Sequence, residues 1–124
     1  MLATTTLIAG GGAAEREAAL AHAIDPQYTT VIVLEGWPGG DAQFARLCHQ
    51  PSVQVIRIAP GCPCCVGNLT LRVTLNRILR HPPQRLYLGL ATAEHLGAVC
   101  EFLRQAPYDS LLHLNQPLLV ASNL

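Results

Sequence analysis

The chain has 124 residues, of which half are hydrophobic and only 13% are charged, well below the roughly 25% of an average soluble domain. All eight of its basic residues are arginine, and they balance eight acidic residues to a formal net charge of zero. This composition excludes the basic stripe of a nucleic-acid-binding protein, and no apolar run approaches the roughly 20 residues of a membrane-spanning helix.

The length predicts a single domain over residues 1–124. The first residues, "MLATTTLIAGGG", lack the basic segment of a signal peptide, so a cytoplasmic location is expected. Because few charges are available to solvate the surface, part of the apolar surface is expected to meet a partner or a second copy of the chain.

Apolar runs and helix-forming runs alternate along the chain. The apolar runs predict strands at 4–9, 29–35, 52–59, 84–90 and 116–122. Helices are predicted at 13–24, 41–49, 68–80 and 93–105. Asp41 is the expected N-cap of the second helix. This alternation predicts an α/β fold, a three-layer sandwich with a mostly parallel sheet of four or five strands.

Four loops follow predicted strands and carry the residues of interest. They are Gly10–Gly12, Glu35–Gly40, Gly61–Cys65 and Gly89–Glu94. Because the carboxyl ends of parallel strands meet at one edge of a sheet, and ligands of such folds bind there, all four loops are expected to open on the same edge.

The first loop is a glycine turn between a strand and a helix, which is typical of a phosphate cradle. In a nucleotide-binding P-loop a lysine reaches the phosphates and a hydroxyl holds magnesium. Placed by distance from the strand, those two positions hold Glu15 and Arg16. Gly10, Gly11 and Gly12 are therefore candidate cofactor-binding residues of a degenerate loop, and GTP hydrolysis by this chain alone is not expected.

Three segments together resemble the CobW-type GTPase metallochaperones, which have a P-loop-NTPase-like fold. "LEGWPGGD" at 34–41 is similar to the family's segment after its second strand. "VIRIAPGCPCC" at 55–65 is similar to its strand and GCxCC metal motif, and "HPPQRLYLGLATAEHLGAV" at 81–99 to its "rPPDrLLIETSGLADPapV" segment. The resemblance covers most of the chain and implies a metal-binding protein.

Other family features differ or are missing. The acidic residue of the "ETSGLADP" segment is replaced by Gly89 and its glycine by Thr92. No N-K-x-D guanine-binding motif occurs, and the family's C-terminal domain has no counterpart within these residues. The resemblance therefore implies a truncated relative that keeps the metal loop without the GTPase machinery.

Cys62, Cys64 and Cys65 are the candidate metal ligands, in a loop between glycines. Thiolates suit Zn²⁺ or another thiophilic divalent metal. Two other interpretations stay open. The thiols are buried as small apolar residues, or Cys62 and Cys65 form a redox pair with C-x-x-C spacing.

A zinc site uses about four ligands, so a further donor is expected from the same edge of the sheet. The candidates are Glu35, Asp41 and His95, or a water molecule. Cys48 and Cys100 lie on predicted helices and are interpreted as core residues, and the remaining histidines as surface residues. These are His22, His49, His81 and His113.

The leading hypothesis is a non-hydrolysing, CobW-like protein that stores, senses or delivers Zn²⁺ or a similar ion. Its expected partners are a metal-requiring client protein and either a second copy or a full-length CobW-type relative. Two alternatives remain. One is a nucleotide-binding, GTPase-like protein completed by a partner, and the other is an interaction module that pairs with an active relative.

Overall fold

A computed structural model of the chain describes residues 2–60 and 66–121. Its strands are β1 (Ala3–Ala9), β2 (Thr30–Glu35), β3 (Val53–Ile58), β4 (Arg85–Gly89), β5 (Leu112–Leu114) and β6 (Leu118–Leu119). Its helices are α1 (Ala13–Ala23), α2 (Ala42–Leu47), α3 (Val66–Ile78), the 3₁₀ turn η1 (Ala93–His95), α4 (Leu96–Leu103) and α5 (Tyr108–Leu111).

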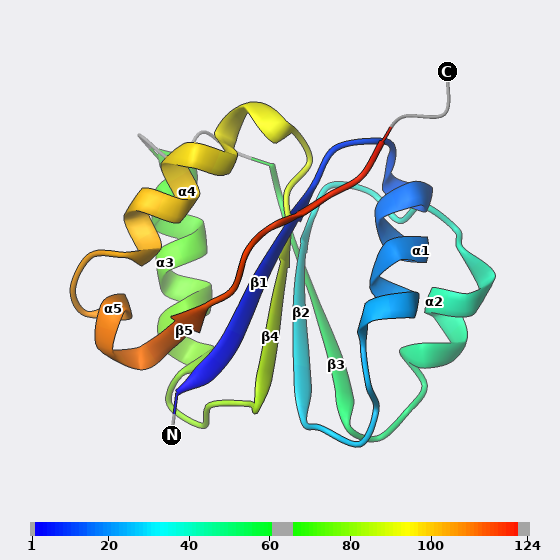
Figure 1. Ribbon diagram of the computed structural model, residues 1–124, viewed down its shortest axis with the longest axis horizontal. Coiled ribbons are helices and arrows are strands. Elements are labelled where there is room, and N and C mark those ends of the chain that lie inside the picture. The colour runs from blue at the N-terminus through cyan, green and yellow to red at the C-terminus, as the bar shows by residue number, and fades with distance from the viewer. Residues whose placement is uncertain (1, 61–65, 122–124) are drawn as a thin grey trace.

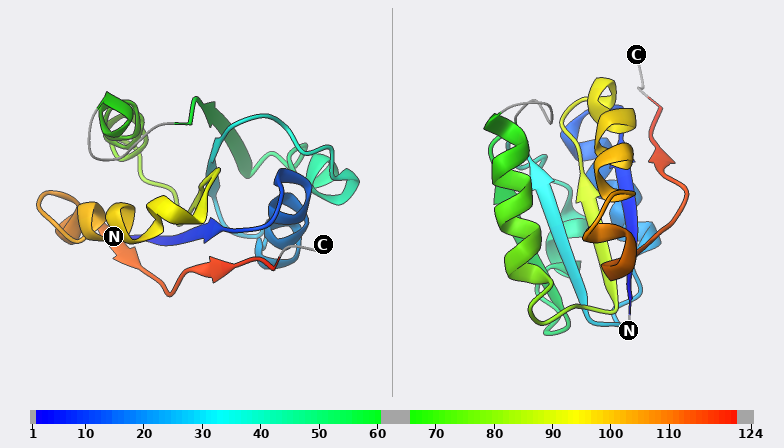
Figure 2. Two further views of the ribbon diagram at one scale, coloured as in Figure 1. Left: turned by 90° about the horizontal axis from the view of Figure 1, so that it is seen from above. Right: turned by 90° about the vertical axis from the view of Figure 1, so that its left-hand side faces the viewer.

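The strands form one parallel sheet in the order β3-β2-β4-β1-β5, with β6 paired to the far end of β1. Helices α1 and α2 cover one face and α3, α4 and α5 the other, which makes three layers (Figure 1). Figure 2 shows the second helical layer from its own side. The predicted α/β sandwich with a mostly parallel sheet is confirmed.

The burial of each strand follows from its place in the sheet. The inner strands β1 and β2 are buried almost throughout, because helices cover both faces of a parallel sheet. The edge strand β3 is more exposed, with Gln54 and Arg57 in solvent. One apolar core fills the side of α3 and α4, around Leu75 and Leu103, and the other fills the side of α1 and α2, around Leu20 and Phe44.

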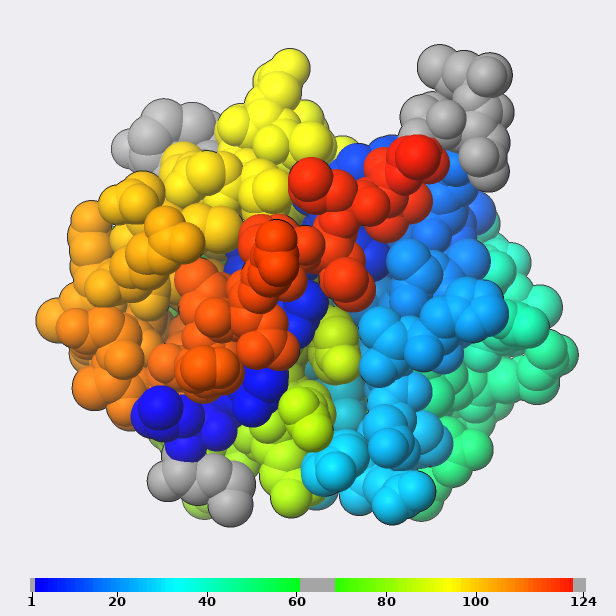
Figure 3. Space-filling view, in the orientation of Figure 1, coloured from blue at the N-terminus to red at the C-terminus, as the bar shows by residue number. Residues whose placement is uncertain are grey.

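The C-terminal part of the chain differs from expectation. Of the strand predicted at 116–122, only the two residues of β6 form a strand, and neither β5 nor the helix α5 before it was predicted. Pro117 lies between the two strands and has no backbone N–H to donate to β1. The segment therefore pairs with β1 at Ala3–Thr5 and again at Ile8–Ala9, leaves it between, and crosses the face of the molecule (Figure 3).

Two further boundaries are informative. The helix predicted at 93–105 begins with the 3₁₀ turn η1, where the Thr92 hydroxyl accepts a hydrogen bond from the Glu94 amide at 3.2 Å. Asp41 caps α2 as expected, because its Oδ2 accepts the Phe44 amide at 2.9 Å. Within the described residues no helix combines the length and the apolar character needed to cross a bilayer.

Candidate functional site

The carboxyl ends of the strands bring their following loops together, as the parallel sheet requires. Glu35 at the end of β2 accepts a hydrogen bond from the Ala91 amide after β4 at 3.1 Å. The Gly36 amide donates to the Ile58 carbonyl at the end of β3 at 3.1 Å. The expected convergence is confirmed for the described loops, whereas Gly61–Cys65 lies outside the described residues.

The glycine turn after β1 is occupied by a side chain of its own helix. Gly10 and Gly11 have φ angles of +95° and +58°, which favour glycine. Their carbonyls accept hydrogen bonds from Arg16 Nη1 at 3.1 and 2.8 Å. Arg16 is buried, and its guanidinium therefore holds the turn closed from the inside.

The N-terminus of α1 also has an internal anion. Glu15 Oε1 accepts the Gly12 amide at 2.8 Å, an arrangement that caps the helix. In a phosphate cradle such an amide would donate to the ligand, but here it meets a carboxylate, which repels a phosphate. The Gly12 amide, which would face a phosphate in such a cradle, is therefore already paired within the chain.

The outer side of the same turn is covered by the chain after β6. The Val120 amide donates to the Ala9 carbonyl at 2.9 Å. A Cβ atom placed on Gly10 would collide with the Val120 carbonyl oxygen. Gly10 is therefore required both for its backbone conformation and for this close approach of two backbone segments.

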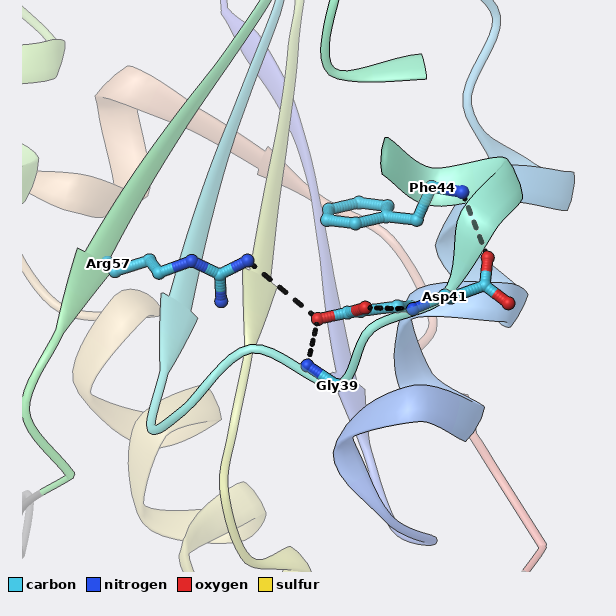
Figure 4. A network of polar contacts seen from close by, with 5 residues as sticks. Gly39, Asp41, Phe44 and Arg57 are labelled. Carbon is cyan, nitrogen blue, oxygen red and sulfur yellow. Dashed lines mark hydrogen bonds and ion pairs between the residues drawn. The ribbon is translucent and has the colours of Figure 1, made fainter. Parts of the chain in front are cut away.

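Glu17 is a buried carboxylate that the sequence analysis did not single out. Only 4% of the residue is exposed. Its Oε2 accepts the Gly39 amide at 2.7 Å, and its Oε1 accepts the Asp41 amide at 3.0 Å (Figure 4). These bonds fix the loop after β2 against α1, where a Cβ on Gly39 would collide with the helix backbone. The spacing of Glu17 to Leu20 and Ile24, on the buried side of α1, was the available signal.

Two cations and two anions meet where these elements converge. Glu17 Oε2 lies 3.8 Å from Arg57 Nη2 on β3. Arg16, Glu17, Glu35 and Arg57 together line a small cavity of about 10 Å³, roughly the room of one water molecule. The opposite charges balance, so this end of the sheet carries a polar cluster without net charge.

The predicted metal ligands are only partly within the described residues. Cys62, Cys64 and Cys65 lie outside them. Among the candidates for a further donor, Asp41 is engaged as the cap of α2, and His95 is half-buried beside α4. No three His, Cys, Asp or Glu side chains of the described ranges are grouped closely enough to hold a metal ion.

The other cysteines and histidines lie close to where they were expected. Cys100 is buried on α4 as part of the core, whereas Cys48, also expected in the core, is half-buried at the end of α2 and packs against the core. Burial raises the pKa of the Cys48 thiol; the nearby Arg57 charge partly offsets this effect and Glu17 adds to it. The four remaining histidines are exposed, namely His22, His49, His81 and His113.

Comparison of the chain with family models, with curated proteins and with solved structures finds no match.

Proposed function

We propose that the protein binds Zn²⁺ or a similar thiophilic divalent ion through Cys62, Cys64 and Cys65, and does so without hydrolysing a nucleotide. Three thiolates in four positions are a donor set that suits such an ion. A loop that supplies three protein donors leaves the coordination shell open to a water or an outside carboxylate. An open shell suits an ion that is stored, sensed or delivered to a client.

The observation that carries the proposal is the meeting of the carboxyl ends of β2, β3 and β4, because the chain continues from β3 into the cysteine motif. Pro60, the last described residue before the cysteines, and Ala91 are the side chains that a Cβ placed on Gly36 would contact. Glu35 is the adjoining residue and already contacts the Ala91 amide. The cysteine loop therefore starts beside a carboxylate, which makes Glu35 the outside donor we favour over Asp41 and His95.

The closed glycine turn supports the non-hydrolysing part of the proposal. Arg16 and Glu15 satisfy the carbonyls and an amide of the turn that a nucleotide would otherwise meet. A phosphate would have to displace the carboxylate of Glu15, and the chain contains no lysine to compensate for its charge. In this proposal, Gly10, Gly11 and Gly12 have a structural role in the turn and do not bind a nucleotide.

Trp37 favours a protein partner at the same end of the sheet. It is the only tryptophan of the chain, it follows Glu35 and Gly36, and its residue surface is 89% exposed. Exposed tryptophan is enriched at the centres of protein interfaces. We propose that this residue contacts the client or a full-length relative during transfer of the ion.

The test is the metal content of protein purified under reducing conditions, measured by mass spectrometry. We expect about one ion per chain, and its loss in Cys64→Ala. Cys48→Ala is the matched control, because it removes a thiol outside the loop and should keep the ion. Protein that holds no stoichiometric ion after gel filtration, or a Cys48→Ala variant that loses it equally, would contradict the proposal.

The role of Glu35 has a separate test. Glu35→Gln keeps an oxygen for the Ala91 amide and removes the charge, so the fold should be preserved. We expect the zinc affinity to fall by about 10-fold to 100-fold, the usual range for a supporting carboxylate. Unchanged affinity would remove Glu35 from the site and leave the three cysteines with water.

A further inference from the structure

A groove lies between α2 and the edge strand β3. Its volume is about 590 Å³, within the usual range of small-molecule sites. The residues that matter for its chemistry are Pro38, Phe44, Ala45, Cys48, Val55 and Arg57. The groove follows the length of α2 (Ala42–Leu47).

The walls of the groove are mainly apolar. Phe44 extends from α2 and Val55 lies on β3, and both belong to the core on that side of the sheet. Ala45 adds a small side chain at the exposed surface of α2. An aromatic or aliphatic body of modest size would therefore have one side removed from water against this wall.

Arg57 supplies the polar end of the groove. Its side chain is 36% exposed, and its nearest acidic oxygen, on Glu17, is 3.8 Å away, beyond hydrogen-bond distance. Among the described residues no hydrogen bond from its guanidinium is found. In Figure 4 the Arg57 side chain and the Phe44 ring extend toward one another from β3 and α2.

The carboxylate of Glu17 does not accept a hydrogen bond from the Arg57 guanidinium. Its two carboxylate oxygens already accept the Gly39 and Asp41 amides at 2.7 and 3.0 Å. The guanidinium therefore has donors free for a second, planar acceptor, and a carboxylate matches its fork-shaped geometry. Two carboxylates, Glu17 and Asp41, also line the groove, and their negative charge limits the site to an anion with a single charge.

We propose that this groove binds a small organic monocarboxylate. Its carboxylate is held by Arg57, and its apolar body lies along Phe44, Ala45 and Val55. The groove has a volume of about 590 Å³ and a single cation among its lining residues, which favours a small molecule with one anionic group. The site is independent of the cysteine loop and does not depend on the proposed metal function.

The test is titration of the isotope-labelled, metal-free protein with 3-phenylpropionate, followed by NMR. We expect saturable shifts of the Phe44, Val55 and Arg57 amides at millimolar probe. The neutral amide of the same probe is the matched ligand, and it should bind roughly tenfold or more weakly because it lacks the charge-assisted contact. Equal binding of acid and amide would overturn the role of Arg57.

Three variants complete the design. Arg57→Gln should weaken the probe about tenfold, whereas Arg46→Gln, which removes an exposed charge of α2 outside the groove, should not. Ala45→Trp should fill the groove and abolish binding, and an unchanged unfolding midpoint verifies that it folds. Probe binding of unchanged strength in Arg57→Gln would overturn the proposal. Amide shifts that depend on protein concentration in the absence of probe would also overturn it, because they would show that a second copy of the chain occupies the groove.

Discussion

The glycine turn after β1 and the groove beside β3 use the same chemical groups in opposite ways. In the turn, Arg16 is buried and donates to the Gly10 and Gly11 carbonyls. In the groove, Arg57 is partly exposed, and its one described polar contact is the 3.8 Å approach to Glu17. A guanidinium whose donors are satisfied stabilises the fold, whereas one with free donors is available to a ligand.

The largest expected loss of stability comes from replacing Gly10, where the turn after β1 contacts the segment after β6. Gly10→Ala should lower the free energy of unfolding by about 3 kcal/mol or more, because it combines a φ of +95° with a collision against Val120. Gly40→Ala is the matched control, with a φ of +81° and open space around its Cβ, and should cost about 1 kcal/mol. Denaturant unfolding measures both, and equal losses would contradict the close contact with the segment after β6.

The second-largest effect is the loss of stability when Arg16 is replaced, compared with the loss when Arg57 is replaced. Arg16→Met should destabilise the protein by about 2–3 kcal/mol, because two carbonyls in the turn lose their donors. Arg57→Met should change stability by no more than about 1 kcal/mol, since its ion pair is long and partly exposed. If both losses in urea unfolding are of similar size, Arg57 is a structural residue and the contrast fails.

Replacing Asp41, the N-cap of α2, should have a smaller effect on stability. The helix α2 forms one wall of the groove. Asp41→Ala should cost about 1 kcal/mol, because the Phe44 amide loses its acceptor. Asp41→Asn should cost much less, since asparagine caps helices nearly as well. Unfolding midpoints measure both variants, and an equally damaging asparagine would show that the charge of Asp41, rather than its cap, is what counts.

The smallest effect is kinetic and depends on pH. Burial raises the pKa of the Cys48 thiol, so alkylation of Cys48 by iodoacetamide should be slower than that of an unfolded cysteine and should still accelerate as pH rises above about 8.5. The stability that comes from burying the neutral Cys48 thiol is fully present below that pH. It is lost as the pH rises through the raised pKa of Cys48 in the folded protein. Mass spectrometry of the Cys48 peptide follows the reaction.

Arg57 provides the internal control for this measurement. Its positive charge lowers the pKa of Cys48 and so opposes the effect of burial. Arg57→Gln should therefore slow the alkylation further at a fixed pH near neutrality, whereas Arg46→Gln should leave it unchanged. A faster reaction in Arg57→Gln would mean that Arg57 shields the thiol sterically instead of acting through its charge.

The layered fold was predictable because each of its strands from β1 to β4 is an apolar run followed by a helix-forming run. The end of the chain was less predictable, since β5 and β6 are too short to show a periodic pattern and exist only because β1 offers them partners. Pro117 marks the break between them but does not indicate which strand they join.

The candidate site was predictable in part for a similar reason. Strand ends in a parallel sheet converge, so the meeting of Glu35 with Ala91 followed from topology. The pairing of Glu17 with Arg57 joins residues far apart in the sequence, and periodicity shows only that Glu17 lies on the buried side of α1. The groove depends on how α2 packs beside β3, which a linear sequence pattern does not reveal.

The position of β1 in the sheet has a consequence for synthesis of the chain. β1 is made first, yet its neighbours are β4 on one side and β5 and β6 on the other. Its pairing must wait until most of the protein has left the ribosome, because contacts distant in sequence form late. A nascent chain that ends before β4 exposes an apolar strand with both edges open, and it is the form most prone to aggregate and most in need of a chaperone.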